Sequence, residues 1–149
     1  MFTRIVSGGQ TGVDRAALDV ALEKGMACGG WCPKGRKAED GRIADRYPLR
    51  ETASAIYPER TRRNVVDSDG TLVLTDGPPA GGTALTIELA DRHRKPCLVI
   101  DLAGQPDPQT VRTWADFHNV QVLNVAGPRA SEKPGIYAQA VQFLRALLA

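Results

Sequence analysis

Short apolar runs alternate with amphipathic stretches along the whole chain, and few folds accommodate that order. The runs Thr71 to Thr75 (TLVLT) and Cys97 to Asp101 (CLVID) are continuously apolar or β-branched, as strands buried on both faces are. Further strand patterns occupy Thr3 to Ser7, Met26 to Trp31 and Val120 to Val125. Strands separated by helices form parallel sheets. The sequence predicts an α/β, Rossmann-like fold with a mainly parallel sheet of about five strands and helices on both faces.

The stretches between these strands have helical spacing. The first begins at Val13 and ends before Gly25, a residue type that commonly follows a helix. Pro58 and Pro108 are well placed to open helices, because proline lacks the N–H that the first turn leaves unpaired. The predicted helices are Val13 to Lys24, Pro58 to about Val66, Thr83 to about His93, one from Pro108, and one carrying the stripe Tyr137, Ala140, Val141, Leu144 and Leu148.

Length and charge restrict the classes of partner. The chain has 149 residues, enough for one compact domain, and no change in composition marks a second, so we expect a single domain over residues 1–149. Nineteen Lys and Arg against seventeen Asp and Glu give a formal net charge of +2, and 5% of the residues are aromatic. Nucleic-acid binding uses a stronger positive field or more stacking side chains. We expect no nucleic-acid partner.

Membrane, metal and nucleophilic sites are not indicated. No apolar stretch approaches the roughly 20 residues of a membrane span, and the N-terminal residues run directly into a strand pattern without a signal-like region. We expect a cytoplasmic protein with no membrane partner. Cys28, Cys32 and Cys97 do not complete a zinc site or a disulfide scaffold. His93 and His118 both fall on predicted helices, and no catalytic triad suggests itself.

Three Gly-rich loops join predicted strands to predicted helices. In parallel α/β sheets, ligands bind outside the carboxyl ends of the strands, where such loops lead into helix N-termini. Glycine lets the backbone bend tightly and approach a ligand, and the free N–H groups at a helix start favour an anion. The three loops therefore predict a site for a phosphorylated small molecule at one edge of the sheet.

The first loop lies within IVSGGQTGVDR, residues 5–15. Its spacing matches neither the dinucleotide motif GxGxxG nor the phosphate motif GxxxxGK[ST]. An ordinary tight turn is therefore the alternative, and Asp14 and Arg15 could equally be solvated residues of the first helical turn. The candidate ligand-binding residues are Gly8, Gly9, Gln10, Thr11, Gly12, Asp14 and Arg15.

The second loop lies within LTDGPPAGGTALTIELA (residues 74–90) and the third within LNVAGPRASEKPGIY (residues 123–137). Thr83 is a plausible helix cap, and Arg129 could hold a phosphate through two parallel hydrogen bonds. Glu88, in the second helical turn, is a candidate catalytic residue, with an ordinary surface glutamate as the alternative. The candidate ligand-binding residues of these loops are Asp76, Gly81, Gly82, Thr83, Gly127, Arg129 and Ser131.

Residues 33–55 show no regular pattern and are rich in charge. We call them the insertion and expect a long charged loop. A stretch of this length inside a compact domain is usually functional or disordered. It either folds over a phosphorylated ligand, with Lys34 as a candidate contact, or is simply solvated. Trp31 and Tyr47 argue against plain disorder.

Four stretches together resemble a known family. They are IVSGGQTGVDRAALDVA, TRRNVVDSDGTLVL, GGTALT and AGPRASEKPGIY, and they are similar to the family called "putative molybdenum carrier" proteins, a circularly permuted branch of the Rossmann-like SLOG superfamily. The resemblance covers nearly the whole chain. It implies a nucleotide or nucleotide-derived ligand at the Gly loops, and the family name implies molybdenum cofactor, a phosphorylated pterin.

A more distant resemblance implies an enzyme. The Lonely Guy phosphoribohydrolases, also known as lysine-decarboxylase-like proteins, carry a PGGxGTxxE motif and an upstream arginine. Gly81, Gly82 and Glu88 keep the spacing of its two leading glycines and its glutamate, whereas Ala84 and Leu85 replace its later Gly and Thr. The candidates for the arginine are Arg60, Arg62 and Arg63. These departures weaken the case for N-glycosidic hydrolysis but not for ligand binding.

Three functional interpretations follow. The first is binding of a phosphorylated, nucleotide-like molecule, such as molybdenum cofactor or a nucleotide. The second is a nucleoside-monophosphate phosphoribohydrolase, and the third is a ligand-sensing oligomeric scaffold. Rossmann-like relatives commonly associate through helices, so by analogy we expect a homo-oligomer, a dimer or higher. The sequence leaves open whether any reaction is catalysed.

Overall fold

Five parallel strands form the central sheet of the computed structural model, which describes residues 1–149. Their spatial order is β2-β1-β9-β7-β8. In the register, Ile5 lies opposite both Cys28 and Leu123, and Thr71 lies opposite both Asn124 and Cys97. The strands are β1 (Arg4–Val6), β2 (Cys28–Gly29), β7 (Gly70–Thr75), β8 (Cys97–Asp101) and β9 (Val122–Ala126). The predicted parallel sheet is confirmed.

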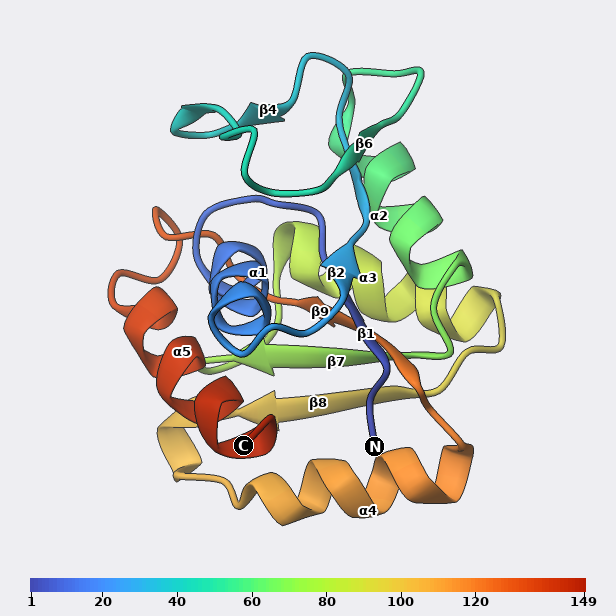
Figure 1. Cartoon of the computed structure of the whole chain (residues 1–149), viewed down its shortest axis with the longest axis vertical. Coiled ribbons are helices and arrows are strands. Elements are labelled where there is room, and N and C mark those ends of the chain that lie inside the picture. Colours follow the sequence, from blue (N-terminus) through green and yellow to red (C-terminus); the bar gives the residue numbers. More distant parts are fainter.

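Helices cover both faces of the sheet, as predicted (Figure 1). On one face α1 packs against α5 and α5 against α4, while α2 and α3 pack together on the other. None of the helices is long and apolar enough to cross a lipid bilayer. The helices are α1 (Val13–Glu23), α2 (Tyr57–Val66), α3 (Gly81–Arg92), α4 (Pro108–His118) and α5 (Ile136–Leu147), and a short 3-10 turn, η1 (Leu102–Gly104), follows β8.

The two faces of the sheet differ in polarity. Side chains alternate between faces along a strand, and Leu72 and Leu123 belong to the large apolar core beneath α1, α4 and α5. On the opposite face, Thr71 and Asn124 are buried, and the Asn124 amide donates a hydrogen bond to the Thr71 hydroxyl at 3.2 Å. The apolar cluster beneath α2 and α3 has only three buried members, which are Val65, Leu89 and Ala90. The α2–α3 face therefore has room for a polar cavity.

Two predicted boundaries are wrong. Helix α3 begins at Gly81 after Ala80, so Thr83 lies inside the first turn and does not cap it. The predicted strand from Met26 to Trp31 divides between two sheets at Gly30. The φ of Gly30 is +134°, and a Cβ there would lie 2.3 Å from the Ser7 carbonyl oxygen. Only glycine permits this bend, after which β3 (Trp31–Cys32) pairs with β6 (Arg50–Glu51).

The insertion is not the structureless loop that its composition predicts. It projects beyond the end of the sheet near α1 (Figure 1) and includes a small antiparallel pair, β4 (Lys37–Ala38) and β5 (Gly41–Arg42). A separate apolar cluster seats the segment on Leu18 of α1. Its other buried members are Cys32, Ala38, Ile43, Tyr47 and Leu49.

Arg36 holds the insertion together from within. Its guanidinium is buried and donates hydrogen bonds to four backbone carbonyls, at 3.0, 3.2, 2.7 and 2.9 Å. The acceptors are the carbonyl oxygens of Ile43, Leu49, Ala44 and Tyr47. A residue that reads as a solvated charge in the sequence thus satisfies backbone groups that no sheet or helix pairs.

Candidate functional site

A cavity of about 330 Å³ lies between α2 and α3 at the carboxyl ends of β1 and β9. Only four of its nineteen lining residues are hydrophobic, so it suits a polar ligand. Helix α2 contributes Tyr57, Pro58, Arg60, Thr61 and Asn64, and α3 contributes Gly81, Gly82, Thr83, Leu85 and Thr86. Strand β9, the loops and the first turn of α1 contribute Asn124, Val125, Ala126, Gly127, Arg129, Glu132, Gly8, Gln10 and Asp14.

All three Gly-rich loops reach this cavity. Parallel strands place their carboxyl ends at one edge of the sheet, so loops far apart in sequence meet there. The sequence-predicted residues that line the cavity are Gly8, Gln10 and Asp14 from the first loop, Gly81, Gly82 and Thr83 from the second, and Gly127 and Arg129 from the third.

The Arg60 side chain extends from α2 to the first loop. It is buried, and its Nη1 donates a hydrogen bond to the Gly8 carbonyl at 2.9 Å. A Cβ at Gly8 would lie 2.5 Å from Arg60 Cδ, so glycine at this position leaves space for the arginine side chain. Of the three candidate arginines, Arg60 alone lines the cavity; Arg62 is exposed, and the Arg63 guanidinium lies 4.4 Å above the Trp31 ring.

Asp14 brings a buried carboxyl group to the same place. It lies in the first turn of α1, with Oδ2 3.8 Å from Arg60 Nη1 and 3.4 Å from the Gln10 amide nitrogen that donates to it. Burial raises the pKa of Asp14 to about 6, although Arg60 and the Gln10 amide oppose the rise. Asp14 can therefore exchange a proton near neutral pH.

Arg129 and the start of α3 add positive potential. Arg129 Nε lies 3.2 Å from Glu132 Oε1 and 3.6 Å from Glu39 Oε1, and its side chain is 41% exposed. Gly81 and Gly82 open α3, and the first N–H groups of a helix have no partner within the helix. The lining thus combines two guanidinium groups with free backbone donors, the groups that bind phosphate oxygens.

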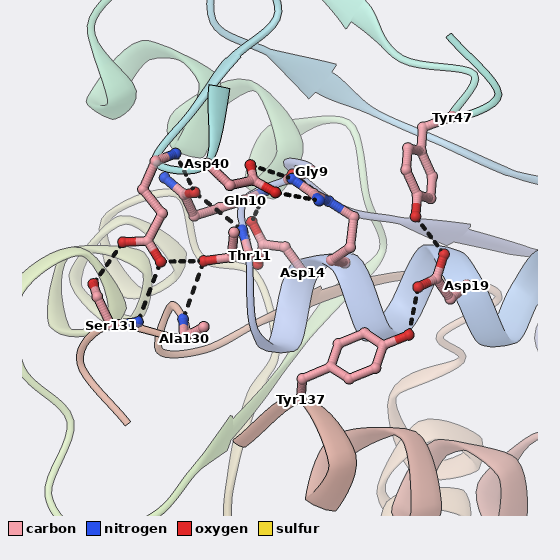
Figure 2. Close-up of polar contacts among 12 residues, drawn as sticks. Gly9, Gln10, Thr11, Asp14, Asp19, Asp40, Tyr47, Ala130, Ser131 and Tyr137 are labelled. Atoms are coloured by element: carbon pink, nitrogen blue, oxygen red, sulfur yellow. Dashed lines mark hydrogen bonds and ion pairs between the residues drawn. The ribbon is translucent and has the colours of Figure 1, made fainter. Parts of the chain in front are cut away.

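Several predicted ligand-binding residues bind the insertion instead (Figure 2). The Glu39 carboxylate accepts hydrogen bonds from the Thr11 hydroxyl and from Ser131, at 2.5 Å from the hydroxyl and 3.2 Å from the amide. These bonds hold the pKa of Glu39 below its usual value. The Gln10 side-chain oxygen accepts from the Glu39 amide at 2.9 Å. Glu39 therefore ties the first and third loops to the insertion.

Arg15 makes a second tie of the same kind. It donates to both Asp40 oxygens, at 3.0 and 3.1 Å, and to the Gly9 carbonyl, at 3.0 and 2.9 Å (Figure 2). A Cβ at Gly9 would lie 2.5 Å from Leu49 Cδ1 of the insertion. Gly9, Thr11, Arg15 and Ser131 thus position the loops and do not line the cavity.

The remaining predicted residues lie elsewhere. Gly12 has φ +79°, and a Cβ there would lie 2.3 Å from the Pro128 carbonyl oxygen, so it joins the first loop to the third. Lys34 and Asp76 do not line the cavity. Glu88 is exposed on α3 and accepts a hydrogen bond from Arg92 at 2.6 Å, also away from the cavity.

Apart from Arg60, one of the three candidate arginines, sequence reasoning missed the residues that α2 contributes to the cavity. Tyr57, Arg60, Thr61 and Asn64 recur at i, i+3, i+4 and i+7, the spacing of one helical face. A polar stripe at that spacing in a helix that must pack on a sheet could have indicated a polar cavity. The charged run around it instead reads as solvent-exposed.

Two comparisons with known proteins match nearly the whole chain. The model of the circularly permutated YpsA SLOG family matches residues 5–148. A crystal structure described as a "putative molybdenum carrier protein", from Syntrophus aciditrophicus SB, is 47% identical, covers 99% of this chain and 96% of its own, and superposes with a TM-score of 0.94. None of the curated proteins matches the chain.

Proposed function

The chain belongs to the circularly permutated YpsA SLOG family, and from its cavity we propose that it binds a phosphorylated, nucleotide-like small molecule. The observation that carries the proposal is the meeting of Arg60, Arg129 and the first turn of α3 at one polar cavity. Guanidinium groups and free helix N–H groups both bind phosphate oxygens. The volume of about 330 Å³ lies at the small end of the range for ligand sites.

The other lining residues suit the rest of such a ligand. Asp14 and the Thr61 hydroxyl offer hydrogen-bonding groups for sugar hydroxyls or ring nitrogens, whereas the Asn64 amide is paired with the Trp31 backbone. Tyr57 and Leu85 supply apolar surface beside them. We propose that the phosphate lies toward Gly81, Gly82 and the arginines, and the ring system toward α2.

Molybdenum cofactor, which the family resemblance implies, fits this cavity in part. Its phosphate would meet Arg60, Arg129 and the α3 N-terminus. The chain has no cluster of three or more His, Cys, Asp or Glu residues able to hold a metal ion, and Cys28, Cys32 and Cys97 do not line the cavity. A molybdenum cofactor carried here would therefore be held through its phosphate and pterin, as a bound cargo.

The test introduces a negatively charged side chain into the cavity. Gly82 lines the cavity, and a Cβ there would meet nothing within 4 Å, so Gly82→Asp should fold. Its carboxylate would repel a phosphate from the start of α3. Ala84→Asp is the matched control, because Ala84 is exposed in the same helical turn but does not line the cavity.

The measurement is calorimetric binding of nucleoside monophosphates and pterin phosphates to the native protein and both variants. We expect a phosphorylated ligand to bind the native protein and Ala84→Asp, and to bind Gly82→Asp at least tenfold more weakly, about 1.4 kcal/mol. Equal affinities in all three proteins, or no binding by any of these ligands, would refute the proposal.

The other interpretations gain no support from the cavity. Because Glu88 lies outside it, Glu88→Gln should bind the same ligand with unchanged affinity. A Glu88→Gln protein that loses binding or releases less free base would restore the phosphoribohydrolase interpretation. A homo-oligomer, whether constitutive or ligand-driven, stays a prediction.

A further inference from the structure

Each arginine of the cavity lies beside a carboxylate. Arg60 Nη1 is 3.8 Å from Asp14 Oδ2, and Arg129 Nε is 3.2 Å from Glu132 Oε1. These four are the charged side chains among the lining residues, so their charges balance. An anionic ligand that approaches either arginine must therefore displace a carboxylate or lie next to one.

The two carboxylates differ in how they can respond. The Glu132 side chain is 39% exposed and lies in the loop before α5, so it can turn into water. Asp14 is 8% exposed, and it lies between Val13 and the buried Ala16 in the first turn of α1. Its carboxylate also accepts from the Gln10 amide. The first turn of α1 and this hydrogen bond therefore hold the Asp14 carboxylate at the wall of the cavity.

An anion beside Arg60 would thus face a buried carboxylate that is held 3.8 Å from the same guanidinium group. Two like charges at short range inside a protein repel strongly, and the arrangement is relieved when one of them takes up a proton. We propose that a ligand anion binding beside Arg60 is accompanied by uptake of one proton at Asp14, so that the cavity binds its ligand more tightly as the pH falls. This inference rests on the proposed function.

The surroundings of Asp14 favour this response. The charged groups facing it are Arg60 from α2 and Arg15 from α1, both of which stabilise the carboxylate. Helix α3 and strand β9 present only uncharged lining residues, and the segment after β9 adds Arg129 and Glu132. Burial outweighs the two nearby arginines and holds the pKa of Asp14 at about 6. Protonation at neutral pH therefore costs little, and the carboxylic acid formed can donate a hydrogen bond to the anion.

Sulfate is the probe for the test, because its charge does not change near neutral pH. Its affinity would be measured by NMR titration of amide shifts between about pH 5.5 and 8, and the Asp14 pKa by the ¹³C shift of its carboxyl carbon. For the native protein we expect sulfate affinity to fall by up to about tenfold per pH unit above the Asp14 pKa. We also expect saturating sulfate to raise that pKa.

Two variants separate the roles of the carboxylates. Asp14→Asn keeps the shape but cannot take up a proton, so its sulfate affinity should not vary with pH and should exceed the native affinity at about pH 8. Glu132→Gln is the matched control and should keep the native pH dependence. Chemical-shift dispersion reports whether each variant is folded.

The outcomes distinguish this inference from the proposed function. Equal pH dependence in the native protein and Asp14→Asn, or an Asp14 pKa that sulfate does not change, overturns proton uptake at Asp14 and leaves the binding site intact. Absence of sulfate binding at the cavity in every protein and at every pH overturns both.

Discussion

The buried Asp14 carboxyl should destabilise the free protein at neutral pH. In the folded state its pKa is raised by burial from the ordinary 3.8 to about 6, whereas in the unfolded chain it ionises near 3.8. Between these values the folded state retains a proton that the unfolded state has released. Rising pH therefore favours unfolding through this window, and the loss is complete above about pH 6.

The size of the effect follows from the same values. One pKa unit corresponds to 1.36 kcal/mol, so ionising Asp14 in the folded protein costs about 3 kcal/mol. Asp14→Asn removes the titration and nearly preserves the shape. The free energy of unfolding of Asp14→Asn, relative to the native protein, should be greater by about 2.4 kcal/mol at pH about 7.5 than at pH about 4, because the unfolded carboxyl is already partly ionised at about pH 4.

Urea unfolding of both proteins at the two pH values measures this double difference. The lowered pKa values of Glu39 and Asp40 have the opposite effect on stability, but they are present in both proteins and cancel. Asp116→Asn, at an exposed position of α4, controls for the loss of one charge. If Asp14→Asn differs from the native protein by the same amount at both pH values, the buried carboxyl is not the cause and the reasoning fails.

Two further predictions concern the loops. Gly12→Ala should lower the free energy of urea unfolding by at least about 2 kcal/mol, because the residue has φ +79° and its Cβ would lie 2.3 Å from a backbone oxygen. Gly25→Ala, at φ +68° with nothing within 4 Å, should cost only about 1 kcal/mol, and equal losses would contradict the argument. Arg36→Met removes the buried hydrogen bonds to four carbonyls of the insertion, so limited proteolysis should cut the insertion much faster. Arg42→Met, at an exposed side chain, should resist cleavage like the native protein; equal cleavage of both variants would refute the role of Arg36.

The sequence was sufficient for the fold because the strands buried on both faces carry a strong local signal. Thr71 to Thr75 and Cys97 to Asp101 lie in β7 and β8, and Pro58 and Pro108 lie in the first turns of α2 and α4. The boundary at Thr83 was wrong because the same residue types occur at helix caps and in the first turn of a helix. The meeting of the three loops could also be predicted, because parallel strands place their carboxyl ends at one edge of the sheet.

Which loop residues line the cavity and which bind the insertion could not be predicted. Thr11, Arg15 and Ser131 have the chemistry of ligand contacts, but their partners, Glu39 and Asp40, lie in a segment whose sequence has no regular pattern. Arg60 was one of three neighbouring arginines, and only the way α2 packs on the sheet decides that Arg60 lines the cavity. Such contacts depend on tertiary placement, which local sequence patterns do not encode.

The unequal apolar packing on the two faces of the sheet has a consequence for how the molecule opens. Segments with few buried apolar contacts unfold locally at lower free energy than the rest of a domain. Helices α2 and α3 rest on a cluster of three buried residues, whereas α1, α4 and α5 share a core of twenty with the sheet. Amide hydrogens of the α2–α3 layer should therefore exchange sooner than those of α1. The wall of the cavity is then the part of the molecule that a ligand would protect most.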